Sequence, residues 1–206
     1  MLRRGAVGLN LMGDFIREAL VSTLDAAGQV HLTPLGYRQR DGRVLLAPFH
    51  PSQTLANLQA HGVAVLNFID DVSVIAGCLT GRRTWPVTPA ERVAVPRLAQ
   101  SLAHWELEVI EVFDDATRPT FECQVVLERV HAPFTGFNRA QAAVIEAAVL
   151  VSRLDWLDPV AVRDDFSRLQ TAIDKTAGPR ERQGWDWLCA ALAQHPRHRD
   201  TTGMRG

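Results

Sequence analysis

The fold is decided by the stretch PFHPSQTLANL, Pro48–Leu58, which lies between segments of strand character. Its two prolines predict a turn, and Ser52 followed by good helix formers predicts a helix that ends at Gly62. The residues that follow, Val63–Phe68 (VAVLNF), are almost all apolar, which is typical of a strand buried on both faces. One short helix is therefore expected inside a series of strands.

Short strands are predicted on both sides of this helix. Those with clear β-forming sequences are Ala19–Leu24, Val30–Tyr37, Arg43–Pro48, Trp105–Phe113 and Phe121–His131. The Asp-Gly pair in Gln39–Gly42 favours a tight hairpin turn, because glycine tolerates the positive φ that such a turn requires. Turns this short join antiparallel neighbours, so the series predicts a closed or split antiparallel barrel.

A second helical pattern occurs inside the strand series, and further helical patterns fill the C-terminal third. The predicted helices are Val72–Leu79 after the caps Asp70–Asp71, then Asn138 to about Arg153, Pro159 to Gly178, and Arg180–Ala193. Asn138 with Gln141 three residues later predicts a capping box. The helix that Asn138 opens is expected to present one side made of Val144, Ile145, Ala148, Val149 and Ser152.

These patterns predict an α+β chain with four parts. Residues 1–14 form a leader and residues 195–206 a polar tail, and both are expected to be disordered. Residues 15–135 form the barrel, and residues 136–194 form a C-terminal helical subdomain. Within the barrel, Thr80–Pro96 holds three prolines and is expected to be irregular.

The composition excludes several classes of protein. The net charge of −1, with no long run of one sign, disfavours broad electrostatic capture of nucleic acid. No stretch reaches the ~18 apolar residues of a membrane span, and the N-terminus lacks the hydrophobic region of a signal peptide, so we expect a cytoplasmic protein. Cys78, Cys123 and Cys189 lie far apart without a histidine at ligand spacing, which predicts reduced thiols and no metal site. No GxSxG, HExxH, Walker or GxGxxG motif occurs, and no catalytic residue is assigned.

The start of the first helix is the best local candidate for a binding site. Unpaired N–H groups at a helix start, together with the hydroxyls of Ser52 and Thr54, suit a phosphate. Asn57 follows Thr54 by three residues and so projects from the same side one turn later. A plain capped helix that binds nothing fits the same local pattern, so this pattern alone leaves both alternatives open.

The order of these segments resembles the FMN-binding split-barrel superfamily, whose flavin reductases carry a Thr-x-x-Asn pair at the helix under the FMN phosphate. More narrowly, the chain resembles an uncharacterised family of archaeal and methylotroph flavoproteins, domain-of-unknown-function family 447, over roughly residues 15 to 193. Leu35 stands where that family usually has methionine, and Ile69 where it usually has threonine. The strings that carry the resemblance are TPLGY (Thr33–Tyr37), PFHPSQTLANL, NFIDDV (Asn67–Val72), GFNRA (Gly136–Ala140), EAAVLVSRL (Glu146–Leu154) and KTAG (Lys175–Gly178).

The resemblance implies FMN as the cofactor, on a split barrel of the FMN-binding type. It places the flavin edge against the backbone of Thr33, Pro34, Leu35 and Gly36, where N–H groups would stabilise the reduced ring. The local alternatives are a simple strand kink at TPLG, core packing for Phe49 and an ordinary surface role for His50. The implied FMN contacts from the strand, the loop and the first helix are Thr33, Pro34, Leu35, Gly36, Phe49, His50, Ser52, Thr54 and Asn57.

Two C-terminal cations complete the set of predicted cofactor contacts, Arg139 and Lys175. Arg139, Glu146 and Arg153 recur every seven residues and so form a polar stripe on a mostly apolar helix. A solvated, charge-paired stripe is one interpretation, and a border of the flavin pocket or of a subunit contact is the other. Lys175 lies at a helix C-terminus, where the helix dipole favours a lysine even without a ligand.

The leading hypothesis is an FMN-dependent oxidoreductase that acts on a small-molecule substrate or redox carrier. The resemblance alone points to a pterin-related substrate of one-carbon metabolism, as in tetrahydromethanopterin pathways, and to a homodimer. The alternatives are a non-catalytic flavin-binding carrier, sensor or assembly protein, and an empty barrel that binds other proteins. Neither a nucleic acid nor a membrane is expected as a partner.

Overall fold

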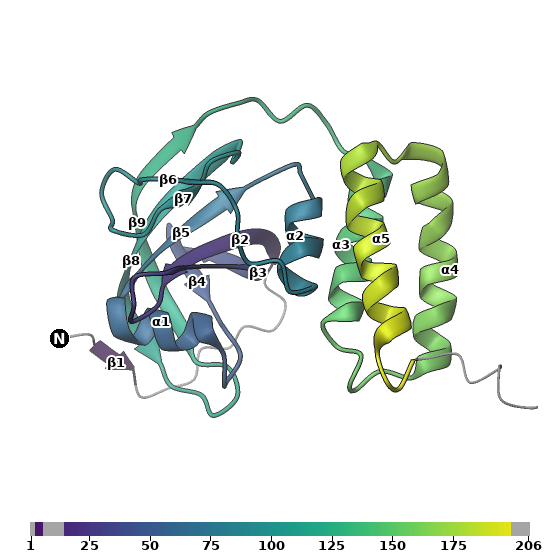
Figure 1. Cartoon of the computed structure of the whole chain (residues 1–206). Coiled ribbons are helices and arrows are strands. Elements are labelled where there is room, and N and C mark those ends of the chain that lie inside the picture. Colours follow the sequence, from purple (N-terminus) through teal and green to yellow (C-terminus); the bar gives the residue numbers. More distant parts are fainter. Residues whose placement is uncertain (1–2, 6–14, 199–206) are drawn as a thin grey trace, which may run out of the picture. The chain divides into compact units, whose positions relative to one another are not determined.

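The computed structural model describes residues 3–5 and 15–198 of the 206-residue chain. The chain divides into two compact units (Figure 1). The barrel unit comprises residues 1–69 and 84–134, and the helical unit comprises residues 70–83 and 135–206. The helical unit is therefore built from two separate segments of the sequence.

Six strands of the barrel unit close into an antiparallel barrel, in the order β8-β5-β2-β3-β4-β9, with β9 paired back to β8. A short seventh strand, β1 (Arg3–Gly5), pairs in parallel with the edge of β8. A two-stranded ribbon of β6 and β7 belongs to the segment between β5 and β8. The bounds are β2 Arg17–Leu24, β3 Val30–Arg40, β4 Arg43–Leu46, β5 Val63–Phe68, β6 Val87–Thr88, β7 Arg97–Leu98, β8 Ala103–Phe113 and β9 Thr120–Val130.

The predicted hairpin turn lies between β3 and β4. Asp41 and Gly42 both have positive φ, 50° and 75°, and the strands on either side pair from Arg40 and Arg43. This is the backbone that a two-residue turn requires to match the strand twist, and the Asp-Gly pair accommodates it with little strain.

The interior of the barrel is filled by alternate residues of the strands and is closed by α1 (Gln53–His61). Leu55 and Leu58 of α1 belong to the same buried cluster as Phe121 and Leu66 of the strands. Helix α1 lies against β2 and β3. It begins at Ser52, whose hydroxyl accepts the N–H of Leu55, and ends at Gly62 with φ of 65°. The structure confirms both predicted ends of this helix.

Opposite faces of the strands support a second, smaller cluster on the outside of the barrel. Val65 of β5 packs with Val93 and Val95 from the segment between β6 and β7. This excursion, residues 84–101, overlaps the segment Thr80–Pro96 that was expected to be irregular, and it has no regular structure apart from the β6–β7 pair. It is nevertheless fixed on the barrel, because Val95 is fully buried.

The helical unit contains α2 (Ser73–Leu79), α3 (Arg139–Val151), α4 (Pro159–Thr176) and α5 (Pro179–Gln194). Helix α5 packs closely on α2, because a Cβ on Gly184 would lie only 3.2 Å from Cα of Ser73 and 3.3 Å from Cβ of Ala76. The start of α3 is tied to the end of α4, since Asn138 Nδ2 donates to the carbonyl of Thr176 at 3.1 Å. No helix in residues 15–198 is long and apolar enough to span a bilayer.

Two predictions about α3 were wrong in detail. The face that the helix buries is Ala140, Ala143, Val144, Ala147 and Ala148, whereas Ser152 is exposed. Small residues allow close packing between helices, whereas the predicted face contained the larger Ile145 and Val149. The Gln141 amide donates to the carbonyl of Asp70 at 2.9 Å, while the Asn138 side chain caps the N–H groups of Ala140 and Gln141. The tertiary contact therefore takes the place of the expected capping box.

The predicted disordered tail starts too early. Residues 195–198 form a turn after α5, and His198 is buried with its Nε2 at 2.9 Å from the carbonyl of Leu154. The sequence alone gave no sign of this contact with the α3–α4 connection. Residues 199–206 lie outside the described residues, as do residues 1, 2 and 6–14 of the predicted leader.

Candidate functional site

The start of α1 presents unpaired hydrogen-bond donors. Ser52 caps the N–H of Leu55, whereas the N–H groups of Gln53 and Thr54 have no partner among the described residues. The same holds for the hydroxyl of Thr54 within the described part of the chain. These three donors and the positive end of the helix dipole can together bind an oxyanion such as a phosphate.

The predicted Thr54–Asn57 pair lies on the inner side of α1. Both residues are buried, at 4% and 2% exposure. Asn57 Nδ2 donates to Oγ1 of Thr23 on β2 at 2.9 Å, and Asn57 Oδ1 accepts from the Gln53 amide at 2.7 Å. Asn57 therefore holds α1 on the barrel, and Thr54 retains the hydroxyl without a partner.

The loop before α1 is held by a residue that the sequence analysis missed, Arg118. Its Nε and Nη2 both donate to the carbonyl of Ala47, at 3.1 and 2.8 Å, and its guanidinium lies 4.2 Å from the ring centre of Phe49. The N–H of His50 also donates to the carbonyl of Thr117 at 2.8 Å. Phe49 and His50 are exposed beside this anchor. Arg118 belongs to the turn between β8 and β9, Asp114–Pro119 (DDATRP), and nothing local in this turn indicated the long-range contact.

The TPLG segment lies in the middle of β3, next to β2. Thr33, Pro34, Leu35 and Gly36 are each half-buried and pair with residues 18–21 of β2. A Cβ on Gly36 would lie 2.8 Å from Cγ2 of Ile16, so the close approach that glycine permits is used by the chain's own Ile16 side chain. Helix α1 packs on β2 and β3, so the strand that carries this segment is one of the two neighbours of the helix.

The two predicted C-terminal contacts belong to the helical unit. Arg139 and Lys175 are both exposed, and so are Glu146 and Arg153 of the polar stripe. The strings around Arg139 and Lys175 have a structural role, because Thr176 Oγ1 accepts the N–H of Ala140 at 3.1 Å. The helical unit also has an open cleft of about 600 Å³ between α4 and α5, with Phe166, Trp185 and His198 among its buried walls.

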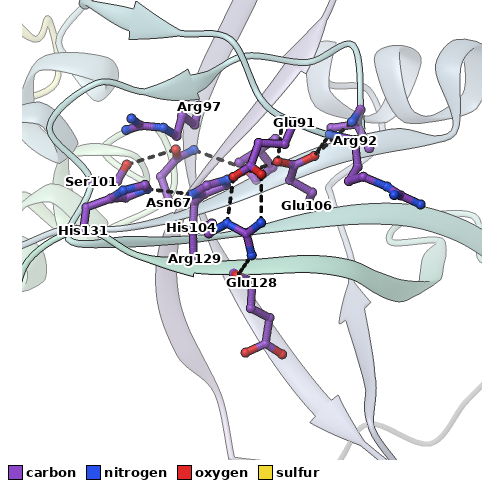
Figure 2. A network of polar contacts seen from close by, with 12 residues as sticks. Asn67, Glu91, Arg92, Arg97, Ser101, His104, Glu106, Glu128, Arg129 and His131 are labelled. Carbon is purple, nitrogen blue, oxygen red and sulfur yellow. Dashed lines mark hydrogen bonds and ion pairs between the residues drawn. The ribbon is translucent and has the colours of Figure 1, made fainter.

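A buried polar network on the outside of the barrel was also missed (Figure 2). Asn67, in the NFIDDV string, donates to the carbonyl of Leu20 and to Ser22 Oγ, and accepts from the N–H of Leu98 and from Ser101 Oγ. It thus joins β2, β5 and the excursion. The only sign of this network in the sequence is Asn67 itself, a single polar residue at the end of an apolar strand.

Glu106 is the second centre of this network and is fully buried. Its carboxylate accepts the N–H groups of Glu91, Arg92 and Val93 at 2.8, 2.6 and 2.9 Å, and its Oε1 lies 3.2 Å from Nε2 of His104. Burial alone raises the pKa of Glu106, but the hydrogen bonds from these backbone groups and from His104 outweigh it and hold the pKa below its ordinary value. The carboxylate is therefore ionised at neutral pH.

His104 connects this carboxylate to His131 at the end of β9. His104 Nδ1 lies 2.9 Å from His131 Nε2, and the two rings are parallel within 3°. His104 is buried, whereas His131 is exposed. Desolvation, followed by the charges of Arg97 and His104, lowers the pKa of His131, although Glu91 acts in the opposite direction. The described residues contain no group of three or more His, Cys, Asp and Glu side chains suited to a metal ion.

Family models identify the family of this chain, and solved structures show its fold. The description "Protein of unknown function (DUF447) N-terminal domain" matches residues 17–132, and "Protein of unknown function (DUF447)" matches residues 138–190. No curated protein matches the chain.

Among solved structures, an FMN-bound protein of the same family from Methanosarcina mazei is 17% identical with a TM-score of 0.77 and covers 87% of this chain and 96% of its own. The styrene monooxygenase flavin reductase of Pseudomonas putida is 17% identical with a TM-score of 0.48, over 57% of this chain and 82% of its own. A flavoredoxin from Methanosarcina acetivorans is 15% identical with a TM-score of 0.49, over 62% and 76%.

The similarity to the Methanosarcina mazei protein extends over most of both chains and so includes the barrel and the C-terminal helices. The fold is thus α+β, a six-stranded antiparallel barrel of the FMN-binding split-barrel type followed by helices. Since the two family models together span the barrel and the helices, this chain belongs to the DUF447 family of proteins of unknown function.

Proposed function

We propose that this protein binds FMN, with the phosphate at the start of α1, and that it is an FMN-dependent oxidoreductase. The observation that supports the site best is the group of three donors without partners among the described residues, the N–H groups of Gln53 and Thr54 and the hydroxyl of Thr54. A phosphate accepts several charge-assisted hydrogen bonds, so this donor set fits its chemistry. The DUF447 protein from Methanosarcina mazei, which has the same fold, was solved with FMN bound.

Each part of the proposed site has a distinct task. The helix start binds the phosphate, and Asn57 and Arg118 position it, through β2 and through the loop before α1 respectively. The backbone of Thr33–Gly36 lies on the strand beside α1, where it would face the flavin once the Ile16 side chain has moved. The bound cofactor would supply the electron or hydride transfer, so no nucleophilic side chain is required.

A threonine variant tests the phosphate site. Thr54→Val keeps the shape of the side chain and removes the hydroxyl, and we expect FMN binding to weaken about 10- to 100-fold, the worth of one hydrogen bond to a charged group. Quenching of flavin fluorescence on titration measures the dissociation constant. Thr171→Val, at an exposed position on α4, is the matched control and should bind FMN as the wild type does. Equal dissociation constants for the two variants would place the phosphate elsewhere.

Turnover is tested separately from binding. Anaerobic addition of NADH, NADPH or a deazaflavin carrier to the FMN-loaded protein should bleach the flavin absorbance if the protein is an oxidoreductase. Failure with every donor would favour the non-catalytic carrier or sensor, and a protein that takes up no FMN would favour an interaction module. The proposed substrate is a small pterin-related molecule of one-carbon metabolism, and the proposed assembly is a homodimer.

A further inference from the structure

A buried carboxylate and two histidines form a linear chain of hydrogen bonds on the outer face of the barrel (Figure 2). Glu106 Oε1 lies 3.2 Å from His104 Nε2, and His104 Nδ1 lies 2.9 Å from His131 Nε2. We propose that these three residues form an acid–base relay, in which Nδ1 of His131 takes a proton from a weakly acidic O–H or S–H group of a ligand. The relay shares no residue with the proposed FMN site and does not depend on it.

The hydrogen-bond order determines which nitrogen carries each proton. Glu106 is an acceptor only, because three backbone N–H groups already donate to it at 2.6–2.9 Å. His104 must therefore donate from Nε2, which leaves its Nδ1 as an acceptor when the ring is neutral. His131 must then donate from Nε2, so its own Nδ1 bears the lone pair.

Nδ1 of His131 is the basic end of the chain. Within the described residues it has no hydrogen-bond partner, and the side chain is exposed. When Nδ1 gains a proton from a ligand X–H, the products are X⁻ and an imidazolium, and no hydrogen bond of the relay is broken. The positive charge can also pass inward, from His131 Nε2 to His104 Nδ1, where it meets the Glu106 carboxylate.

The surrounding charges favour a ligand that becomes an anion. Arg97 and Glu91 of the excursion, His104 of β8 and Arg129 of β9 are the charged or titratable groups whose fields act on His131. Glu91 is paired with Arg129 through two hydrogen bonds of 2.8 Å. Arg97 makes hydrogen bonds only to the carbonyls of Leu98 and Ala99 within the described residues, so its charge remains uncompensated beside His131.

Nuclear magnetic resonance of the histidine-¹⁵N-labelled, full-length protein tests the proton positions without any variant. At neutral pH, His131 should show a bare Nδ1 and a protonated Nε2, and His104 should show the same pattern. A neutral His131 with the proton on Nδ1 would overturn the relay.

The role of Glu106 is tested by diethyl pyrocarbonate, which acylates imidazole nitrogens that bear a lone pair. In Glu106→Gln the amide N–H₂ faces His104 and turns that ring into an acceptor at Nε2, which inverts both tautomers. The rate of acylation at His131, followed by mass spectrometry, should fall about tenfold, the population change that one neutral hydrogen bond imposes. Glu122→Gln, at a partly buried glutamate on β9, is the matched control, and exposed His61 is the internal reference. An unchanged rate at His131 in a folded Glu106→Gln protein would contradict the relay.

The ligand class is tested with 4-nitrophenol, whose phenolate is yellow. Addition of wild-type protein at mildly acidic pH should increase the phenolate absorbance, because His131 accepts the proton and Arg97 stabilises the anion. His131→Asn should abolish the increase, and His61→Asn should not. No increase with the wild type would show that the site does not take a ligand of this class.

Discussion

At the scale of single residues, Asn67 shows how one buried amide can fix three segments of chain. Its side chain makes hydrogen bonds to Leu20, Ser22, Val65, Leu98 and Ser101. Because it is fully buried, bulk solvent does not reach these groups in the native protein, and each depends on the amide for this hydrogen bond.

Asn67→Ala should therefore be strongly destabilising. It leaves the N–H of Leu98 and the hydroxyl of Ser22 without this partner, and each buried group left unsatisfied costs about 1–3 kcal/mol. The Ser101 hydroxyl keeps its hydrogen bond to the carbonyl of Leu98 at 2.9 Å. We expect the free energy of unfolding to fall by about 3 kcal/mol or more, measured by urea denaturation. Ser101→Ala removes only one hydroxyl and should cost about 1 kcal/mol. A loss below that of Ser101→Ala would mean that the amide does not join the segments.

Several single residues were predictable and others were not. Ser52, Gly62 and the Asp41-Gly42 turn were correct because capping and positive φ are local requirements, visible within four residues of sequence. Arg118 and Glu106 were missed because their partners are 71 and up to 15 residues away along the chain. The side-chain type shows that such a residue can form hydrogen bonds, but only the fold determines which group is its partner.

At the scale of elements, helix α5 approaches α2 at Gly184, the one residue of α5 that lacks a side chain. Gly184 lies inside α5, where glycine costs about 1 kcal/mol relative to alanine in helix propensity. The close approach to Ser73 and Ala76 explains why a glycine is retained there.

Gly184→Val should separate the two helices. Its branched side chain would have to displace the backbone of Ser73, and overpacking of this kind typically costs about 1–3 kcal/mol. Thermal unfolding followed by circular dichroism should show a lower midpoint. Gln183→Val, one residue earlier and exposed, introduces the same side chain and should change the midpoint little. Equal midpoints for the two variants would mean that the close packing at Gly184 does not contribute to stability.

Strand β5 and helix α1 were predicted with nearly correct bounds, whereas the buried face of α3 was not. An apolar run or a cap defines an element by its own composition. The buried face depends on what the element packs against, and Ala140, Ala143 and Ala147 are buried because neighbouring helices approach closely. The strand order, with β9 paired to β8 and β4, could be inferred only as far as an antiparallel barrel.

At the scale of the whole molecule, the relay makes the stability of the fold depend on pH. The pKa of His131 is lowered from its ordinary value of 6.5, so the folded protein binds this proton less readily than the unfolded chain. Its contribution to stability is full above about pH 6.5 and is lost as the pH falls through the lowered pKa. The pKa of Glu106 is likewise lowered, from 4.5. The stability that Glu106 contributes is therefore lost at still lower pH, as the pH falls through its own lowered pKa.

The free energy of unfolding should thus fall on acidification in two steps, one that begins below pH 6.5 and one that begins below pH 4.5. Urea denaturation at a series of pH values measures both. His131→Gln should remove the upper step and leave the lower one, because Glu106 keeps its backbone donors. An upper step that persists in this variant would belong to another histidine.

The helical unit is assembled from residues 70–83 and from residues after 134, with the last barrel strands encoded between them. A fragment that starts at residue 135 would lack α2 and would expose the surface of α5 around Gly184. During translation, α2 leaves the ribosome about a hundred residues before α5. The face of α2 that packs on α5 therefore lacks this partner until α5 has been synthesised. No single uninterrupted stretch of this sequence therefore encodes the helical unit, because residues 84–134 of the barrel unit interrupt it.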